Sequence, residues 1–247
     1  MNAIELLPVE GLPEITEGHD LGALIARQAE LADGDVVVVV QKAVSKAEGR
    51  RAKLADVVPG ERAIEIAARM DKNPALVELI LRDTRQVIRD ERVLIVETTS
   101  GLICANAGID SSNTGAEGEV ILLPVDPDAS AQRIRAELQA ATGHRLAVVV
   151  TDSFGRPWRV GQTEVAIGCA GIDAVDDWRG RSDRDGRVLA ATEIAIGDEI
   201  AAASDLVRGK DSGVPAVIVR GLADRVTEAD GPGAAALRRD EANDLFR

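Results

Sequence analysis

Aromatic residues are scarce in this sequence. They make up 2% of the chain, with two Phe, two Trp and no Tyr. The core must therefore be built from Val, Ile, Leu and Ala. The 247 residues are 45% hydrophobic and 29% charged, a composition that is ordinary for a globular protein and excludes a disordered one. A chain of this length forms one large domain or two modest ones, with a sizeable core.

Cysteine is also scarce, with only Cys104 and Cys169. Two cysteines form no disulfide framework and supply no metal-binding spacing, and we expect both in the core. The N-terminus lacks the basic region and the apolar run of a signal peptide. No apolar stretch reaches the roughly 20 residues of a membrane helix. We therefore expect a cytoplasmic protein with no membrane partner.

Positive charge is in deficit, because the net charge is -13 at pH 7. So acidic a chain is a poor partner for nucleic acids or membrane surfaces, which are polyanionic. A phosphorylated ligand would need a local basic cluster or a metal ion. The sequence also lacks a Gly-x-Gly-x-x-Gly motif after a strand and a Gly-x-x-x-x-Gly-Lys-Ser/Thr motif. We therefore predict neither a Rossmann nor a P-loop fold.

Hydrophobic periodicity and turn residues predict strands and helices that are interspersed without a clean alternation. The predicted strands cover residues 3–7, 36–40, 87–88, 93–96, 101–105, 120–123, 145–150 and 216–220. The predicted helices cover residues 20–29, 61–72, 74–82, 126–143 and part of 192–207, with a helical tail after Gly233. This order predicts a mixed α+β or α/β architecture.

The run from Arg145 to Trp158 and Arg159 carries the clearest functional signal. An apolar, β-branched strand ends in Thr151-Asp152-Ser153, and a glycine and a proline then force a turn. A buried strand that delivers a carboxylate and two hydroxyls to its end is typical of a metal or phosphate site. Arg156 and Arg159 follow, and arginine suits anionic oxygens. They alternatively pair with the excess of surface acids.

Two carboxylates stand at predicted strand ends. Asp110 lies in Asn-Ala-Gly-Ile-Asp-Ser-Ser-Asn, and Asp152 lies in Thr-Asp-Ser. Hard oxygen ligands of this kind suit Mg²⁺ or Mn²⁺. The alternative is that each aspartate caps a turn through nearby backbone N–H groups. Asp152 is the stronger candidate, because the run before it predicts a buried strand.

Lys46, with Ser45 and Arg50, follows the five valines of residues 36–40. These cations could meet phosphate oxygens just beyond a buried strand. The alternative is a solvated turn. From the residues alone we predict an enzyme-like protein with a divalent-metal and polyphosphate site.

Several long motifs, in order, make the prediction more specific. They are Pro-Val-Glu-Gly-Leu-Pro, Ser-Lys-Ala-Glu-Gly-Arg, Asn-Ala-Gly-Ile-Asp-Ser-Ser-Asn, Leu-Leu-Pro-Val-Asp-Pro-Asp, Thr-Asp-Ser-Phe-Gly-Arg-Pro-Trp-Arg, Asp-Trp-Arg-Gly-Arg-x-Asp, Asp-Glu-Ile-Ala-Ala-Ala and Val-Pro-Ala-Val-Ile-Val-Arg-Gly. From about Leu6 to Leu222 the chain resembles the coenzyme F420-0:gamma-glutamyl ligase family. The resemblance implies one ligase unit over residues 1–247, built from two interleaved lobes in a homodimer, without the C-terminal nitroreductase-like domain of some relatives.

The resemblance also implies a reaction. Members of the family use GTP to activate the lactyl carboxyl of the deazaflavin F420-0 as an acyl phosphate, join L-glutamate to it, and then add gamma-linked glutamates. The implied cofactors are Mg²⁺ or Mn²⁺ and a monovalent cation such as K⁺. The alternatives are a metal-dependent phosphoesterase and a non-catalytic nucleotide-binding module.

Site residues follow from the matching motifs. Asp110, Asp152 and Ser153 resemble the metal ligands. The implied GTP contacts are Glu10, Gly11, Leu12, Pro13, Gln41, Lys42, Lys46, Asn113, Leu206, Val207, Arg208, Gly209, Lys210, Asp211, Ser212 and Gly213. The last loop departs from the family, which often has a metal-binding Gln or Glu where this chain has Arg-Gly-Lys-Asp; Asp211 or water would have to replace it. Arg156 and Arg159 are our own candidates, from charge, for catalytic groups that bind the anionic acceptor.

Overall fold

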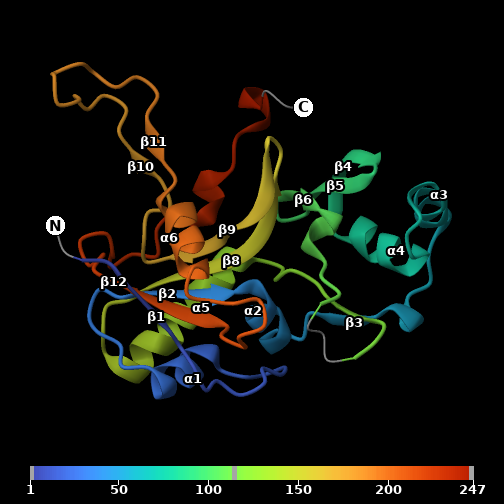
Figure 1. Cartoon of the computed structure of the whole chain (residues 1–247), viewed down its shortest axis with the longest axis horizontal. Coiled ribbons are helices and arrows are strands. Elements are labelled where there is room, and N and C mark those ends of the chain that lie inside the picture. Colours follow the sequence, from blue (N-terminus) through green and yellow to red (C-terminus); the bar gives the residue numbers. More distant parts are fainter. Residues whose placement is uncertain (1–2, 113–115, 245–247) are drawn as a thin grey trace.

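A five-stranded sheet forms the centre of the computed structural model, which describes residues 3–112 and 116–244 (Figure 1). Its strands, in spatial order, are β1 (Glu5–Pro8), β12 (Ala216–Arg220), β2 (Val36–Val40), β8 (Ala147–Arg156) and β9 (Arg159–Ala170). The pair β2 and β8 is parallel, and the other neighbours are antiparallel. Residues that follow β2 and residues in the second half of β8 therefore meet on one side of the sheet.

Four of the five valines of β2, Val36 to Val39, are buried, on both faces of the sheet, as the unbroken apolar run predicts, and Val40 is half-buried. Val37 and Val39 pack in a cluster with residues of α1 (Leu21–Gln28) and α5 (Pro127–Thr142). Val36 and Val38 pack on the other face, in a cluster with residues of α6 (Ile196–Asp205). Figure 1 shows α1 and α6 on opposite sides of the sheet.

The predicted helix boundaries follow from side-chain and glycine caps. Asp20 accepts a hydrogen bond from the N–H of Ala23 at 2.7 Å, and Asp126 accepts one from Ala129 at 3.0 Å. Helix α5 ends at Gly143, whose φ of 73° is left-handed. These contacts confirm the helices predicted after Asp20 and Asp126.

A third cluster lies beside the central sheet, at the right of Figure 1. It joins the two helices α3 (Glu61–Met70) and α4 (Pro74–Arg82) to a small sheet of β4 (Thr84–Glu91), β5 (Val93–Thr98) and β6 (Ile103–Ala105). The short pair of β3 (Arg51–Lys53) and β7 (Glu119–Ile121) connects this part to the rest. The strands β10 (Asp176–Asp177) and β11 (Glu193–Ile194) carry an arm that projects from the body.

The mixed architecture of helices and strands is confirmed. Four features stay predictions: the two interleaved lobes, the single ligase unit over residues 1–247, the homodimer, and the exclusion of Rossmann and P-loop folds. Within the described ranges, no helix is long and apolar enough to cross a bilayer.

The predicted end of the central strand at residue 150 is wrong. Strand β8 continues to Arg156 and forms a hairpin with β9, so the turn lies only at residues 157–158. The register shifts between Val150 and Thr151, where an irregularity marks the change from apolar to polar residues. Backbone pairing with β9 keeps this polar segment extended, and it brings Ser153 opposite Glu164.

Two further predictions need correction. No helix was predicted after β2, where a solvated turn was the alternative to a phosphate-binding segment, but residues Gln41–Ala47 form helix α2, because Ala43 and Val44 are buried against the core. The tail after Gly233 forms only two short 3₁₀ turns, Ala234–Leu237 and Glu241–Asn243.

Candidate functional site

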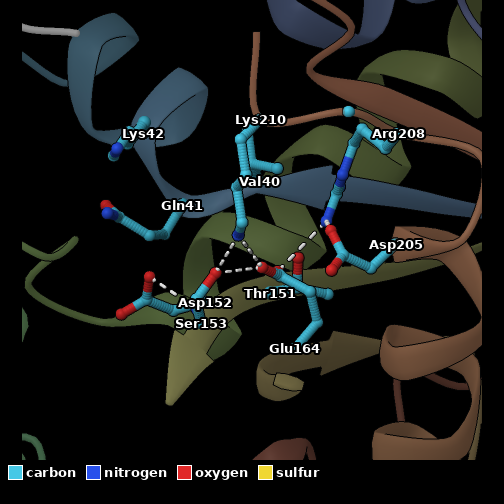
Figure 2. A pocket seen from close by; sticks show the side chains of 11 residues that line it. Val40, Gln41, Lys42, Thr151, Asp152, Ser153, Glu164, Asp205, Arg208 and Lys210 are labelled. Atoms are coloured by element: carbon cyan, nitrogen blue, oxygen red, sulfur yellow. Dashed lines mark hydrogen bonds and ion pairs between the residues drawn. The ribbon is translucent and has the colours of Figure 1, made fainter. Parts of the chain in front are cut away.

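Two adjoining cavities open beside the end of β2. The smaller has a volume of about 130 Å³ and is lined by Val40, Gln41, Lys42, Thr151, Asp152, Ser153, Glu164, Asp205, Arg208, Gly209 and Lys210 (Figure 2). The larger has a volume of about 460 Å³ and is lined by Leu12, Pro13, Glu14, Ile15, Val40, Lys42, Ala43, Lys46, Lys210, Asp211, Gly213, Val214 and Pro215. Lys42 and Lys210 line both cavities, so two ammonium groups stand at the boundary between them.

Asp152 supplies a carboxylate whose negative charge is poorly compensated. Burial raises its pKa to about 7; the N–H of Ser153, 2.9 Å away, opposes the rise, and the charges of Glu164 and Asp110 add to it. The neighbouring Thr151 is fully buried, whereas Asp152 keeps some exposure. A cation would be stabilised at this position.

Ser153, Glu164 and Lys210 form a polar cluster at the centre of the small cavity. The hydroxyl of Ser153 donates a hydrogen bond to Oε1 of Glu164 and accepts one from Nζ of Lys210 at 2.6 Å. Figure 2 shows these three side chains pointing toward one another, with Arg208 on one side and Gln41 on the other. Burial alone would raise the pKa of Glu164, but the Ser153 hydroxyl and the charges of Arg208 and Lys210 lower it overall. Glu164 is therefore charged at neutral pH.

Asp110 lines neither cavity, but it is paired with Lys42, which lines both. Its Oδ2 is 2.6 Å from Nζ of Lys42, and its Oδ1 accepts a hydrogen bond from the N–H of Ser112 at 2.6 Å. Burial raises the pKa of Asp110, and the contacts with Lys42 and Ser112 outweigh this effect and lower it. Asp110 thus accepts an N–H bond from two residues on, as a turn-capping aspartate does, and it also carries an ion pair with a helix distant in sequence. Asp152 bonds only the N–H of the next residue, inside strand β8.

The donors around Asp152 fit a divalent cation in part. Asp110, Asp152 and Ser153 supply hard oxygens, and the raised pKa of Asp152 marks a place where positive charge is lacking. Within residues 3–112 and 116–244, however, no three His, Cys, Asp or Glu residues are grouped to hold a metal by themselves. Substrate oxygens and water would have to complete the coordination, as is usual for Mg²⁺.

The structure brings together most of the residues expected to contact GTP. Leu12, Pro13, Lys42, Lys46, Lys210, Asp211 and Gly213 line the large cavity, and Gln41, Arg208 and Gly209 line the small one. Lys46 is mostly buried and lies 2.6 Å from Glu14, so it is not part of a solvated turn. The remaining residues of this set, Glu10, Gly11, Leu206, Val207 and Ser212, line neither cavity, and Asn113 lies outside the described residues.

Arg156 and Arg159 lie apart from both cavities. They flank the exposed turn of the β8–β9 hairpin, where Nη2 of Arg156 donates to the carbonyl of Val160 at 2.7 Å. That these two arginines bind the anionic acceptor substrate stays a prediction. They lie at the turn end of the hairpin that also carries Ser153 and Glu164.

Sequence reasoning missed Glu164, which is 4% exposed, and Asp205. Glu164 begins the small-residue, apolar stretch of residues 164–170, Glu-Val-Ala-Ile-Gly-Cys-Ala, for which the sequence predicted no site residue. A lone acid at the start of such a stretch is a signal, because a buried carboxylate needs a charged or hydrogen-bonding partner. That partner becomes visible only when the hairpin register is known.

Comparison with known proteins identifies the family to which this chain belongs. A family model described as F420-0:Gamma-glutamyl ligase matches residues 11–221. The coenzyme F420:L-glutamate ligase of Halobacterium salinarum is 52% identical over 219 residues, covering 86% of this chain and 85% of the relative. The proteins of the same name from Archaeoglobus fulgidus and Methanothermobacter thermautotrophicus are each 44% identical, covering 99% of this chain and 96% and 99% of their own lengths.

Proposed function

Because this chain belongs to the F420-0:gamma-glutamyl ligase family, we propose that it joins L-glutamate to the lactyl carboxyl of F420-0 and then adds gamma-linked glutamates, using GTP. The observation that carries the proposal is the boundary between the two cavities. Lys42, which is paired with Asp110, and Lys210 both line this boundary, with a space of about 460 Å³ on one side and a space of about 130 Å³, lined by Asp152, on the other.

The proposed chemistry needs positive charge at this boundary. A carboxylate is a poor electrophile until one of its oxygens becomes a phosphate leaving group, so the terminal phosphoryl group of GTP is first transferred to the acceptor carboxylate. We assign Lys42 and Lys210, which line both cavities, to neutralise charge on the moving phosphoryl group, and Lys46, which lines the large cavity, to bind the other phosphates. A Mg²⁺ or Mn²⁺ ion held by Asp110, Asp152 and Ser153 would supply further charge neutralisation when bound.

The second step forms the amide. The neutral amine of glutamate attacks the carbonyl carbon of the acyl phosphate; the C–N bond forms, the C–O bond to phosphate breaks, and the amine loses a proton as phosphate leaves. Family membership also supports our proposals of a homodimer, a cytoplasmic location and a role for a monovalent cation such as K⁺.

A single assay tests the proposal. The protein is incubated with GTP, Mg²⁺ or Mn²⁺, L-glutamate and F420-0, and product mass is followed. The expected result is a mass gain of one or more glutamyl residues with equal release of GDP and phosphate. Folded protein that yields no such gain contradicts the proposal. GTP loss without dependence on glutamate indicates a phosphoesterase instead, and GTP binding without turnover indicates a non-catalytic module.

A further inference from the structure

Two lysines contact oxygens that the resemblance assigns to the metal ion. Nζ of Lys42 lies 2.6 Å from Oδ2 of Asp110, and Nζ of Lys210 donates a hydrogen bond to the hydroxyl oxygen of Ser153 at 2.6 Å. Figure 2 shows the two lysines entering from different elements, Lys42 from α2 and Lys210 from the loop after α6. Ammonium groups therefore cap two of the three side chains that are implied as metal ligands.

An ammonium group and a divalent ion compete for these oxygens. The Ser153 hydroxyl donates its proton to Oε1 of Glu164, so it offers other groups only lone pairs, and Lys210 takes one of them. One oxygen of Asp110 accepts a backbone N–H, and Lys42 takes the other. A divalent ion on either capped oxygen would lie within a few ångströms of an ammonium group, where like charges repel. Firm metal binding therefore requires the two ammonium groups to move.

Both ammonium groups can move, and the large cavity gives them a destination. The side chains of Lys42 and Lys210 are 25% and 71% exposed, and contacts between groups this exposed are weak. Each lysine lines the large cavity as well as the small one, and the lysine stem is flexible. Phosphate oxygens of a nucleotide in the large cavity would therefore attract the same ammonium groups away from Asp110 and Ser153.

We propose that Lys42 and Lys210 are exchangeable counter-ions that couple nucleotide binding to metal binding. They cap Asp110 and Ser153 until nucleotide phosphates take the two ammonium groups, and the released oxygens then bind the divalent ion. The inference rests on the GTP and the metal ion of the proposed ligase function. Because coupling between two binding events is reciprocal, the metal ion should also raise the affinity for the nucleotide.

Lys46 provides an internal comparison. It lines the same large cavity, and its Nζ lies 2.6 Å from Oε1 of Glu14. Glu14 is not among the implied metal ligands, so the release of Lys46 by phosphate frees no such oxygen. Replacing Lys46 removes a positive charge near the nucleotide but leaves Asp110 and Ser153 capped. A general effect of lost charge on metal affinity would appear in Lys46 variants too, whereas the exchange is confined to the other two lysines.

The first test measures Mn²⁺ binding to the full-length protein by electron paramagnetic resonance at pH 8, without nucleotide. Lys42→Met and Lys210→Met should each lower the Kd for Mn²⁺ roughly threefold to fivefold, the factor expected when one partly exposed competing contact is removed. Lys210→Arg keeps the positive charge and should bind Mn²⁺ as wild type does. Lys46→Met should also leave this Kd unchanged.

The second test measures the coupling itself. The Kd of a non-hydrolysable GTP analogue is measured by calorimetry in EDTA and in excess Mn²⁺, and the ratio of the two values is the coupling factor. In Lys42→Met and in Lys210→Met this factor should fall about as much as the Kd for Mn²⁺ alone falls, because no ammonium group remains to be displaced from that oxygen. Lys46→Met should weaken binding of the analogue under both conditions and keep the coupling factor of wild type.

Both measurements are made without turnover, so they separate this proposal from the ligase function. A Kd for Mn²⁺ that is the same in wild type, Lys42→Met and Lys210→Met overturns the exchange, and so does an equal decrease in Lys46→Met. Wild type that shows the expected exchange but adds no glutamate to F420-0 supports the exchange and contradicts the ligase. Active wild type whose Lys42 and Lys210 variants keep the normal coupling factor contradicts the exchange alone.

Discussion

Replacing Asp152 by asparagine should make the metal-free protein relatively more stable at high pH. In the folded protein, burial raises the pKa of Asp152 to about 7 from an ordinary 3.8, and the charges of Glu164 and Asp110 add to the rise. The folded state therefore holds a proton that the unfolded chain releases. Stability that depends on this proton is present at low pH and is lost as pH rises toward the folded pKa.

The size of the effect follows from the two pKa values. Between pH 5 and pH 8 this proton linkage costs the wild type about 2.5 kcal/mol of unfolding free energy. Asp152→Asn has no titrating group at this position, so its stability relative to wild type should increase by the same amount over that range.

Urea denaturation in EDTA gives the unfolding free energies of Asp152→Asn and of wild type at pH 5 and at pH 8. The change in their difference between the two pH values is the quantity that is tested. Asp33→Asn is the control, because a hydrogen bond from the backbone N–H of Arg145 lowers the pKa of Asp33. This variant should not become more stable relative to wild type between pH 5 and pH 8. A stability difference between Asp152→Asn and wild type that is the same at both pH values would refute the reasoning.

The same variant tests the metal assignment. Mn²⁺ at pH 8 should raise the Tm of wild type, because a ligand that binds only the folded state stabilises it. Asp152→Asn should lose this increase and lose turnover, while its circular dichroism spectrum stays that of a folded protein. Normal activity of the variant at limiting Mn²⁺ would show that Asp152 is not a metal ligand.

Three further outcomes are expected from the structure. Lys46→Met should raise the KM for GTP about tenfold and leave the KM for glutamate unchanged, because it removes a mostly buried cation from the large cavity. Steady-state kinetics that show equal changes in the two KM values would contradict this prediction. Arg156→Gln/Arg159→Gln should raise the KM for F420-0 alone, and an unchanged value would exclude these exposed residues from acceptor binding. Gly168→Ala should destabilise the protein by about 1–3 kcal/mol in urea denaturation, because its Cβ would lie 2.1 Å from the carbonyl oxygen of Pro127. Gly155→Ala, with no atom within 4 Å of its Cβ, should have little effect and serves as the control.

The elements that depend on local patterns were predictable. The strand 36–40 follows from an unbroken apolar run, and the helices after Asp20 and Asp126 follow from caps that act within three residues. Helix α2 was not predictable in the same way. Its sequence, Gln-Lys-Ala-Val-Ser-Lys-Ala, is polar enough for a turn, and burial of Ala43 and Val44 against a distant cluster decides the matter.

The composition of the site was also largely predictable, but its arrangement was not. Asp110, Asp152 and Lys46 could be selected because each follows a predicted strand. Nothing local indicated that Lys42 would pair with Asp110, since 68 residues separate them and the contact requires α2 and the segment after β6 to meet. The hairpin register likewise had to be known before Glu164 could be placed opposite Ser153.

By itself, then, the sequence determined the type of chemistry: oxygen ligands, cations and a buried strand that presents them, in a family pattern that runs through the chain. Those properties are local, because they depend on residue type and on neighbours within a few positions. Only the tertiary structure decided that the polar residues divide between two cavities and that Arg208 and Glu164 form a buried ion pair. These features depend on the parallel pairing of β2 with β8 and on the hairpin of β8 with β9, which bring distant segments together. The Thr151-Asp152-Ser153 segment therefore lies inside that hairpin, where its second strand supplies Glu164.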